Sequence, residues 1–189
     1  GDAAITVAIS GARARIQGNY IGTDASGTVD VDGSAALIPG RSGILLQPDV
    51  NGVVIGGVAP GAGNLISGNG YYGIEILRDV TNTVIQGNRI GTDASGQVAL
   101  GNGYGVGLWQ AGAGNVIGGA AVGAGNVIAA NLRNGLALAE VAGVVVQGNR
   151  IGLTADGSAT LANGWNAVEI VSASGILIGT DGDGTSDAA

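Results

Sequence analysis

The sequence predicts an all-β fold, a parallel β-helix of five to six coils with about 31 residues in each coil. The first observation is an internal repeat, which is the sequence signature of a solenoid. The hexapeptide Gln-Gly-Asn-Arg-Ile-Gly at 86–91 returns at 147–152, and it returns with Tyr in place of Arg at 17–22. Gly-Ala-Gly-Asn-Leu-Ile at 61–66 returns at 123–128 with Val in place of Leu. Because the repeat is uninterrupted, we predict a single domain over residues 1–189.

Two short strands are predicted in each coil, and their spacing sets the length of the coil. Apolar-x-apolar triplets have the period of two that strands show, and from Ile44 onward they recur at intervals of 30, 32, 30 and 32 residues. A second apolar strand follows each triplet after 10 or 11 residues. The triplets begin at Ile5, Ile44, Ile74, Val106, Leu136 and Val168, and the second strands contain Ile16, Ile55, Ile85, Ile117, Val146 and Ile178.

Composition supports this fold and excludes several others. No window keeps a 3.6-residue period long enough for a helix. With 39 Gly but only 3 Pro and no Gly-X-Y period, the glycine-rich chain matches neither collagen nor a disordered segment. It has no Phe and no Met, as expected when Val, Ile, Leu and Ala fill a narrow interior. Parallel strands need a crossover connection, which the rest of each coil supplies.

Charge and missing residue types narrow the function. Seven Arg against eleven Asp and three Glu leave a net charge of -7, so nucleic acid, which binds basic faces, is not expected as a partner. No apolar run approaches the ~20 residues that span a bilayer. Because the chain has no His and no Cys, nucleophiles of the Ser-His or Cys-His kind and a zinc site are excluded.

The repeated motifs resemble the right-handed parallel β-helix repeats of very large bacterial surface or secreted proteins. Asn-Val-Ile-Gly-Gly at 115–119 and Val-Ile-Gln-Gly-Asn-Arg-Ile-Gly-Thr-Asp-Ala-Ser-Gly at 84–96 carry the resemblance, which covers essentially the whole chain. It implies a pectate-lyase-like β-helix architecture and, together with the acidity, an extracellular or cell-surface location. The same architecture is similar to that of polysaccharide lyases, hydrolases and non-catalytic adhesins, so the fold does not choose among these activities.

Carboxylates are the remaining route to an enzyme. Glu75 and Glu169 share the outward column of the first strand, but they stand three coils apart, about 14 Å by the strand spacing. The carboxyl pairs of glycosidases are ~5 to ~9.5 Å apart. These two glutamates therefore do not form a catalytic pair.

A second group of polar residues is better placed. Asp49 and Asp79 each stand five residues after the start of their triplets, on adjacent coils, which puts them about 5 Å apart. Arg78, Trp109 and Glu140 fall on neighbouring positions of the following coils. Two carboxylates beside an arginine can bind calcium and help to abstract a proton from an acidic sugar, and the tryptophan can stack on a sugar ring. The alternative is that the aspartates shape turns and Arg78 neutralises them, because aspartate is a common turn residue.

Acidic loops give a candidate metal site. Asp181, Asp183 and Asp187 stand at positions 1, 3 and 7 of a Gly-rich loop that resembles the Asp-x-Asp-Gly loops of calcium-binding repeats. Asp30 and Asp32 form a shorter version near the N-terminus. Calcium takes six to eight oxygen ligands, and neither loop supplies them alone. The prediction is no cofactor, with calcium at these aspartates as the open alternative.

Several features are predicted to be structural. The Gly-Thr-Asp-Ala-Ser-Gly turns at 22–27 and 91–96 are expected to bond their own backbone through Thr, Asp and Ser. The glycines of 61–63 and 101–105 are expected to provide positive φ at corners. Asn19, Asn88 and Asn149 recur once per two coils, so they are expected about 10 Å apart and not in a continuous ladder. The second strands carry two adjacent apolar columns, of which one must face outward.

The function predicted from these residues is a non-catalytic structural or adhesive module of an extracellular assembly. The chain begins on a strand and stops within a coil, so it is expected to be a segment of a longer solenoid or a unit that self-associates through its coil ends into filaments. The alternative is a polysaccharide-binding or polysaccharide-degrading protein, of lyase or hydrolase type, that uses Asp49, Arg78, Asp79, Trp109 and Glu140.

Overall fold

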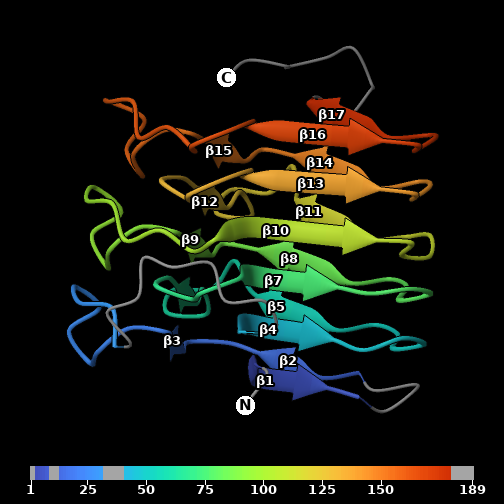
Figure 1. The fold of residues 1–189 in the computed structure, drawn as a ribbon, viewed down its shortest axis with the longest axis horizontal. Coiled ribbons are helices and arrows are strands. Elements are labelled where there is room, and N and C mark those ends of the chain that lie inside the picture. The colour runs from blue at the N-terminus through green and yellow to red at the C-terminus, as the bar shows by residue number, and fades with distance from the viewer. Residues whose placement is uncertain (1–2, 9–12, 32–40, 180–189) are drawn as a thin grey trace.

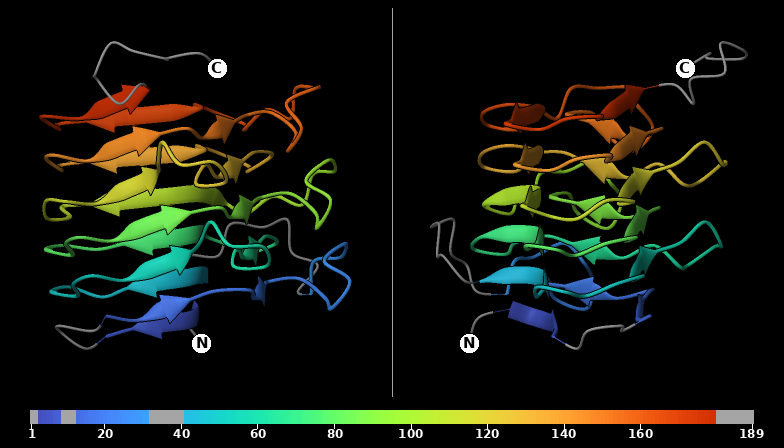
Figure 2. Two further views of the ribbon diagram at one scale, coloured as in Figure 1. Left: turned by 180° about the vertical axis from the view of Figure 1, so that it is seen from behind. Right: turned by 90° about the vertical axis from the view of Figure 1, so that its right-hand side faces the viewer.

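The computed structural model of the chain is a stack of coils with a parallel sheet on each of three sides. It describes residues 3–8, 13–31 and 41–179. Successive coils lie one above another from the N-terminal to the C-terminal end (Figure 1), and views from behind and from the side show the three sheets (Figure 2). Every strand pairs in parallel with its equivalent in the neighbouring coil. The structure thus confirms the predicted fold class, a parallel β-solenoid, and connections of this kind are right-handed in nearly all proteins.

Each of the first five coils contributes one strand to each sheet, in the chain order sheet A, sheet B, sheet C, and the described part of the sixth coil contributes strands to sheets A and B. Sheet A has six strands: β1 (Ala3–Val7), β4 (Ser42–Leu46), β7 (Tyr72–Ile76), β10 (Tyr104–Trp109), β13 (Leu136–Ala139) and β16 (Val168–Val171). Sheet B has six: β2 (Arg15–Ile16), β5 (Val54–Gly56), β8 (Val84–Gln86), β11 (Val116–Gly118), β14 (Val145–Gln147) and β17 (Leu177–Gly179). Sheet C has five: β3 (Tyr20–Ile21), β6 (Leu65–Ile66), β9 (Arg89–Ile90), β12 (Val127–Ile128) and β15 (Arg150–Ile151).

The core is a set of apolar columns that run along the axis of the stack. The register pairs each inward side chain with the same position one coil away, as Ile44, Ile74 and Val106 are paired. Stacking like on like fills the narrow interior without large aromatic side chains, and these columns are almost completely buried. The strands of sheets A and B are those that the sequence predicts. The strands of sheet C are only two residues long and were not predicted.

Asparagine side chains form a continuous ladder between sheets B and C, so the prediction of isolated asparagines is wrong. Each side-chain amide nitrogen donates to the side-chain oxygen of the next asparagine at 2.8 to 3.0 Å. The spacing estimate failed because Asn64 and Asn126, from the other coil type, fill the intervening levels. The shared pattern Asn-x-Ile is the sequence signal. The ladder residues are Asn19, Asn64, Asn88, Asn126 and Asn149.

A second ladder runs between sheet C and sheet A. Its side-chain bonds are 2.8 to 3.0 Å long, and each amide group also donates to the carbonyl of a sheet C residue in the coil before it. The backbone leaves the sheet at this corner, so its polar groups need other partners in the interior. Together the two ladders satisfy those groups on both sides of sheet C. The second ladder comprises Asn69, Asn102, Asn131 and Asn163.

At three of the predicted corner positions, glycine is required by the close approach of another coil and not by a positive φ. Gly61 has a φ of 78°, as predicted. At Gly63, Gly101, Gly103 and Gly105 no positive φ occurs, so the expectation of positive φ at these four positions is wrong. An added Cβ at Gly63, Gly101 and Gly105 would lie 2.0, 2.2 and 2.3 Å from a carbonyl oxygen of another coil. Glycine is needed at these three positions because stacked backbones leave no room for a side chain.

The acidic turns form a column of their own beside sheet C. In each turn the aspartate accepts hydrogen bonds from nearby backbone and serine groups, as predicted; Asp93 accepts from the amides of Gln97 and Val98. The turns occur on alternate coils, yet they touch, because the Ala94 amide donates to the Gly27 carbonyl at 2.8 Å. The hydrogen bond from the Ser26 side chain, with smaller contributions from backbone hydrogen bonds, lowers the pKa of Asp24 to about 2. The outward residues of sheet B are half-buried from the second coil to the fifth, at Val54, Val84, Val116 and Val145.

One buried hydroxyl breaks the apolar pattern. Thr83 precedes β8 and is fully buried, and its Oγ1 has no hydrogen-bond partner in the described part of the chain. Valine has nearly the same shape and no buried polar atom, so Thr83→Val removes a desolvation cost. We expect the free energy of unfolding to rise by about 1 kcal/mol, measured by urea denaturation. Thr81→Val, at a position whose hydroxyl accepts a bond from Asn51, serves as the control and is expected to give no gain. Equal gains in both variants would contradict this explanation.

Candidate functional site

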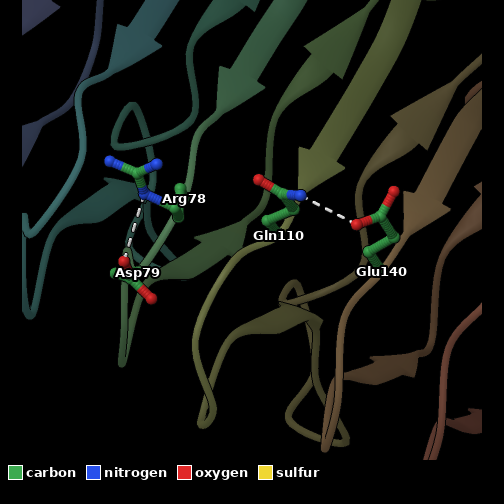
Figure 3. Close-up of polar contacts among 4 residues, drawn as sticks. All are labelled: Arg78, Asp79, Gln110 and Glu140. Carbon is green, nitrogen blue, oxygen red and sulfur yellow. Dashed lines mark hydrogen bonds and ion pairs between the residues drawn. The ribbon is translucent and has the colours of Figure 1, made fainter.

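The corner after sheet A brings together part of the polar group predicted from sequence. Arg78 Nε lies 3.3 Å from Asp79 Oδ2, and the Gln110 side-chain amide donates to Glu140 Oε2 at 2.8 Å (Figure 3). Both contacts are exposed to solvent, where ion pairs and hydrogen bonds contribute little to stability. The corner offers carboxylates on successive coils, but each of these two contacts joins only one pair of residues.

The corner residues share an unusual backbone conformation. Asp49, Asp79, Gln110 and Glu140 all have positive φ, between 54° and 67°. Aspartate tolerates the left-handed region better than most residues, which gives these positions a turn role independent of any ligand. The Asp49 amide donates to the Arg78 carbonyl, which places Asp49 one coil before that residue. Sequence reasoning missed Gln110 because the positive-φ residue of the corner comes five residues after the start of the triplet in the second and third coils, but four residues after it in the fourth and fifth.

Trp109 does not join the corner group. It ends β10 on the outer side of sheet A, with its ring centroid 6.4 Å from that of Tyr72. Its indole N–H is hydrogen-bonded to the Tyr72 hydroxyl, which partly offsets the effect of burial in raising the pKa of that tyrosine. The structure therefore places Trp109 in a different cluster from Asp79 and Glu140.

Most of the candidate calcium ligands lie outside the residues that the structure describes. Asp32, Asp181, Asp183 and Asp187 lie outside the described residues, and Asp30 forms a bridge with Thr23 in the first acidic turn. Within the described ranges no group of three or more acidic side chains is close enough to hold a metal ion. Calcium binding stays a prediction. It is checked by calorimetric titration with millimolar calcium, in which the absence of heat would contradict it.

An aromatic column, defined by Tyr72, Tyr104, Arg133 and Trp165, runs along the outer side of sheet A. The Tyr72 and Tyr104 rings stack with centroids 4.6 Å apart and an interplanar angle of 19°. The Arg133 guanidinium then lies 5.3 Å from the Tyr104 ring and 4.4 Å from the Trp165 ring. Arg133 also donates to the Tyr104 hydroxyl at 2.6 Å. Stacked rings and a cation between rings hold the column together across four coils.

A glycine makes room for the buried end of this column. Tyr72 is buried, and a Cβ on Gly107 would lie 2.4 Å from its Cε1 atom. Tyr71 packs edge-on against Tyr72 at 4.7 Å. The other end of the column is open, since Trp165 is 60% exposed; Trp109, which packs against Tyr72, is 39% exposed. The rings thus form a platform with a fixed base and accessible indoles.

Two glutamates lie on the same outer face, at the third and sixth coils. The register Glu75, Gly107, Ala137, Glu169 confirms their shared column and their separation by three coils. Each carboxylate accepts one side-chain hydrogen bond from the coil before it: Glu75 from the Ser42 hydroxyl at 2.6 Å, and Glu169 from Asn134 at 2.9 Å. The matching bonds hold both carboxylates in place on the outer face of sheet A.

Burial raises the pKa of Glu75, and the hydrogen bond from Ser42 only partly opposes this effect. Because the folded state binds the proton more tightly than the unfolded chain, stability falls as the pH rises from the ordinary glutamate value through the raised one. We expect Glu75→Gln to raise the melting temperature at pH 7 and to leave it unchanged near pH 4. Glu140→Gln is the exposed control. A gain of equal size at both pH values would contradict the assignment to ionisation.

The fold defines the chain as a parallel β-solenoid repeat protein. Comparison with protein-family models, curated proteins and solved structures gave no significant match. The function is therefore inferred from the surfaces of the chain. Among the described residues, no helix is long and apolar enough to cross a bilayer. Chemically, the outer face of sheet A offers stacking and hydrogen bonding, and the corner offers exposed carboxylates.

Proposed function

We propose that the chain is a non-catalytic structural module of an extracellular or surface assembly, and that it grows by stacking coils end to end. The observation that carries this proposal is the exposed core of the sixth coil. Ile170 and Ile178 are 46% and 48% exposed, whereas their partners one coil below, Leu138 and Val146, are buried. Inward-facing columns that end in open solvent favour a further coil above them.

The backbone at this level is also available for pairing. Within the described residues, β15, β16 and β17 have partners on one side only. An unpaired parallel edge is a template for another strand, and solenoids usually protect it with an atypical end repeat. A coil of the same repeat matches all three edges and all the inward columns at once.

A second copy of the chain can supply that coil. At the opposite end of the stack, Ile5 and Val7 of β1 are only partly buried although they pack against the core. Contact between the two ends is head to tail and does not close, so it builds a filament. The resemblance of the repeat to those of large bacterial surface proteins supports the extracellular location and the adhesive role that we include in this proposal.

Light scattering coupled to gel filtration tests the proposal with two variants. Ile170→Lys places a charge in the contact and is expected to leave monomers at concentrations where the native chain forms oligomers. The control is Val122→Lys, which adds the same charge at a loop residue that is 98% exposed. Native protein that stays monomeric throughout, or oligomers that persist unchanged in Ile170→Lys, would overturn the proposal.

A further inference from the structure

We propose that the outer face of sheet A is a binding site for an uncharged polysaccharide, which stacks on Trp165 and Trp109. The site lies on the outer side of sheet A, from the third coil to the sixth, and its residues differ from the inward-facing ones that coil stacking would cover. Its residues are the aromatic column together with Tyr71, Trp109, Glu75 and Glu169. It differs from the corner group predicted from sequence, with which it shares only Trp109.

The aromatic residues of the chain gather on this face. The chain has two Trp and four Tyr, and all except Tyr20 lie in this cluster. A solenoid core built from small aliphatic side chains does not need them, and the two indoles remain substantially exposed. Exposed tryptophans supported from beneath are costly to leave in water. The arrangement indicates a ligand that covers them.

Carboxylates lie on the same face as the rings and can accept hydrogen bonds from a ligand. A pyranose ring presents C–H bonds on its faces and hydroxyl groups around its edge. The C–H faces suit the electron-rich faces of indole and phenol rings. Carboxylates are strong acceptors for hydroxyl groups, and Glu75 and Glu169 are already oriented by their bonds to Ser42 and Asn134. Apolar faces flanked by fixed polar groups are typical of small-molecule sites.

The charge of the face and of the whole chain favours an uncharged ligand. The face carries Glu75 and Glu169, and the guanidinium of Arg133 is held between the Tyr104 and Trp165 rings, with its N–H donating to Tyr104. The chain as a whole has a net charge of -7. A polyanion is repelled by this field, whereas a neutral chain of sugars is not. The extended platform over several coils suits a polymer that lies along the axis.

Affinity gel electrophoresis tests the proposal directly. The native chain is run through native gels that contain laminarin, xylan, galactomannan or polygalacturonate. We expect retardation in at least one of the three neutral polysaccharides and none in polygalacturonate. Because both tryptophans lie at the site, their fluorescence is expected to change on titration with the same polysaccharide.

Matched variants separate the site from the rest of the surface. Trp165→Ala is expected to weaken retardation about tenfold, as for an interface hot spot. Tyr20→Ala removes the aromatic side chain outside the cluster, which is 52% exposed, and is expected to change nothing. Trp165 is exposed, so its loss does not threaten folding, and circular dichroism verifies this.

Three results would overturn the proposal. They are no retardation in any neutral polysaccharide, retardation that Trp165→Ala leaves intact, and retardation confined to polygalacturonate. If Trp165→Ala instead reduces oligomer size by light scattering and leaves the gels unchanged, the cluster is a contact between protein chains. That outcome also distinguishes this proposal from end stacking, which Ile170→Lys tests separately.

Discussion

Replacing Asn88 with alanine is expected to lower the free energy of unfolding by about 4 kcal/mol. Asn88 is buried at the centre of the first asparagine ladder. Its side chain donates to the Ile55 carbonyl and to Asn126, and it accepts from both the backbone and the side chain of Asn64. Alanine leaves the Asn64 amide and the Ile55 carbonyl buried without partners, and each such group costs about 1 to 3 kcal/mol.

Urea denaturation followed by circular dichroism measures this loss. The control is Asn51→Ala, which removes a single exposed hydrogen bond to Thr81 and is expected to cost less than about 0.5 kcal/mol. If the two variants lose similar amounts of stability, the ladder does not contribute as its buried bonds indicate.

Replacing Gly125 with alanine is expected to cost about 3 kcal/mol or more, and to reduce the yield of soluble protein. A Cβ at this position would lie 1.9 Å from the Gly148 carbonyl oxygen of the next coil. That carbonyl belongs to the backbone beside Asn149, which bonds Asn126 in the ladder, so it cannot move without breaking those bonds. The two coils would have to separate.

A control variant at Gly143 separates the effect of backbone conformation from the effect of contact between coils. Gly143 has a φ of 65°, and an added Cβ there would meet nothing within 4 Å. Gly143→Ala is expected to cost only the left-handed strain, about 1 kcal/mol. Denaturation of both variants gives the comparison, and equal costs would show that the close approach at Gly125 is relieved elsewhere.

The fold was predictable because the period of the apolar residues is written in the sequence. Triplets at Ile44, Ile74 and Val106 become paired levels of sheet A. Sheet C was not predicted because its two-residue strands are too short to show a period of two. The ladder was missed for a related reason: Asn64 and Asn88 occur in different motifs, and only the three-dimensional stack puts them on one line.

The aromatic column was harder to predict from sequence than the corner group. Asp79 and Glu140 were found by counting residues from the triplets, and that count is correct to within one position. Tyr104, Arg133 and Trp165 lie about 30 residues apart in sequence and differ in type, so no repeat connects them. Only the register of sheet A brings the rings and the guanidinium into contact. A signal was nevertheless present, since aromatic residues are rare in this chain and five of the six fall between 71 and 165.

Negative-stain electron microscopy of the native chain over a range of concentrations tests the central claim most directly. Stacking of coils predicts rods of constant width whose length increases with concentration, while Ile170→Lys yields only short particles. The same grids prepared with calcium and with a chelator show whether a metal ion contributes to the junction. Short particles of one length at every concentration, identical in the native chain and in Ile170→Lys, would contradict the claim that this solenoid is built to extend.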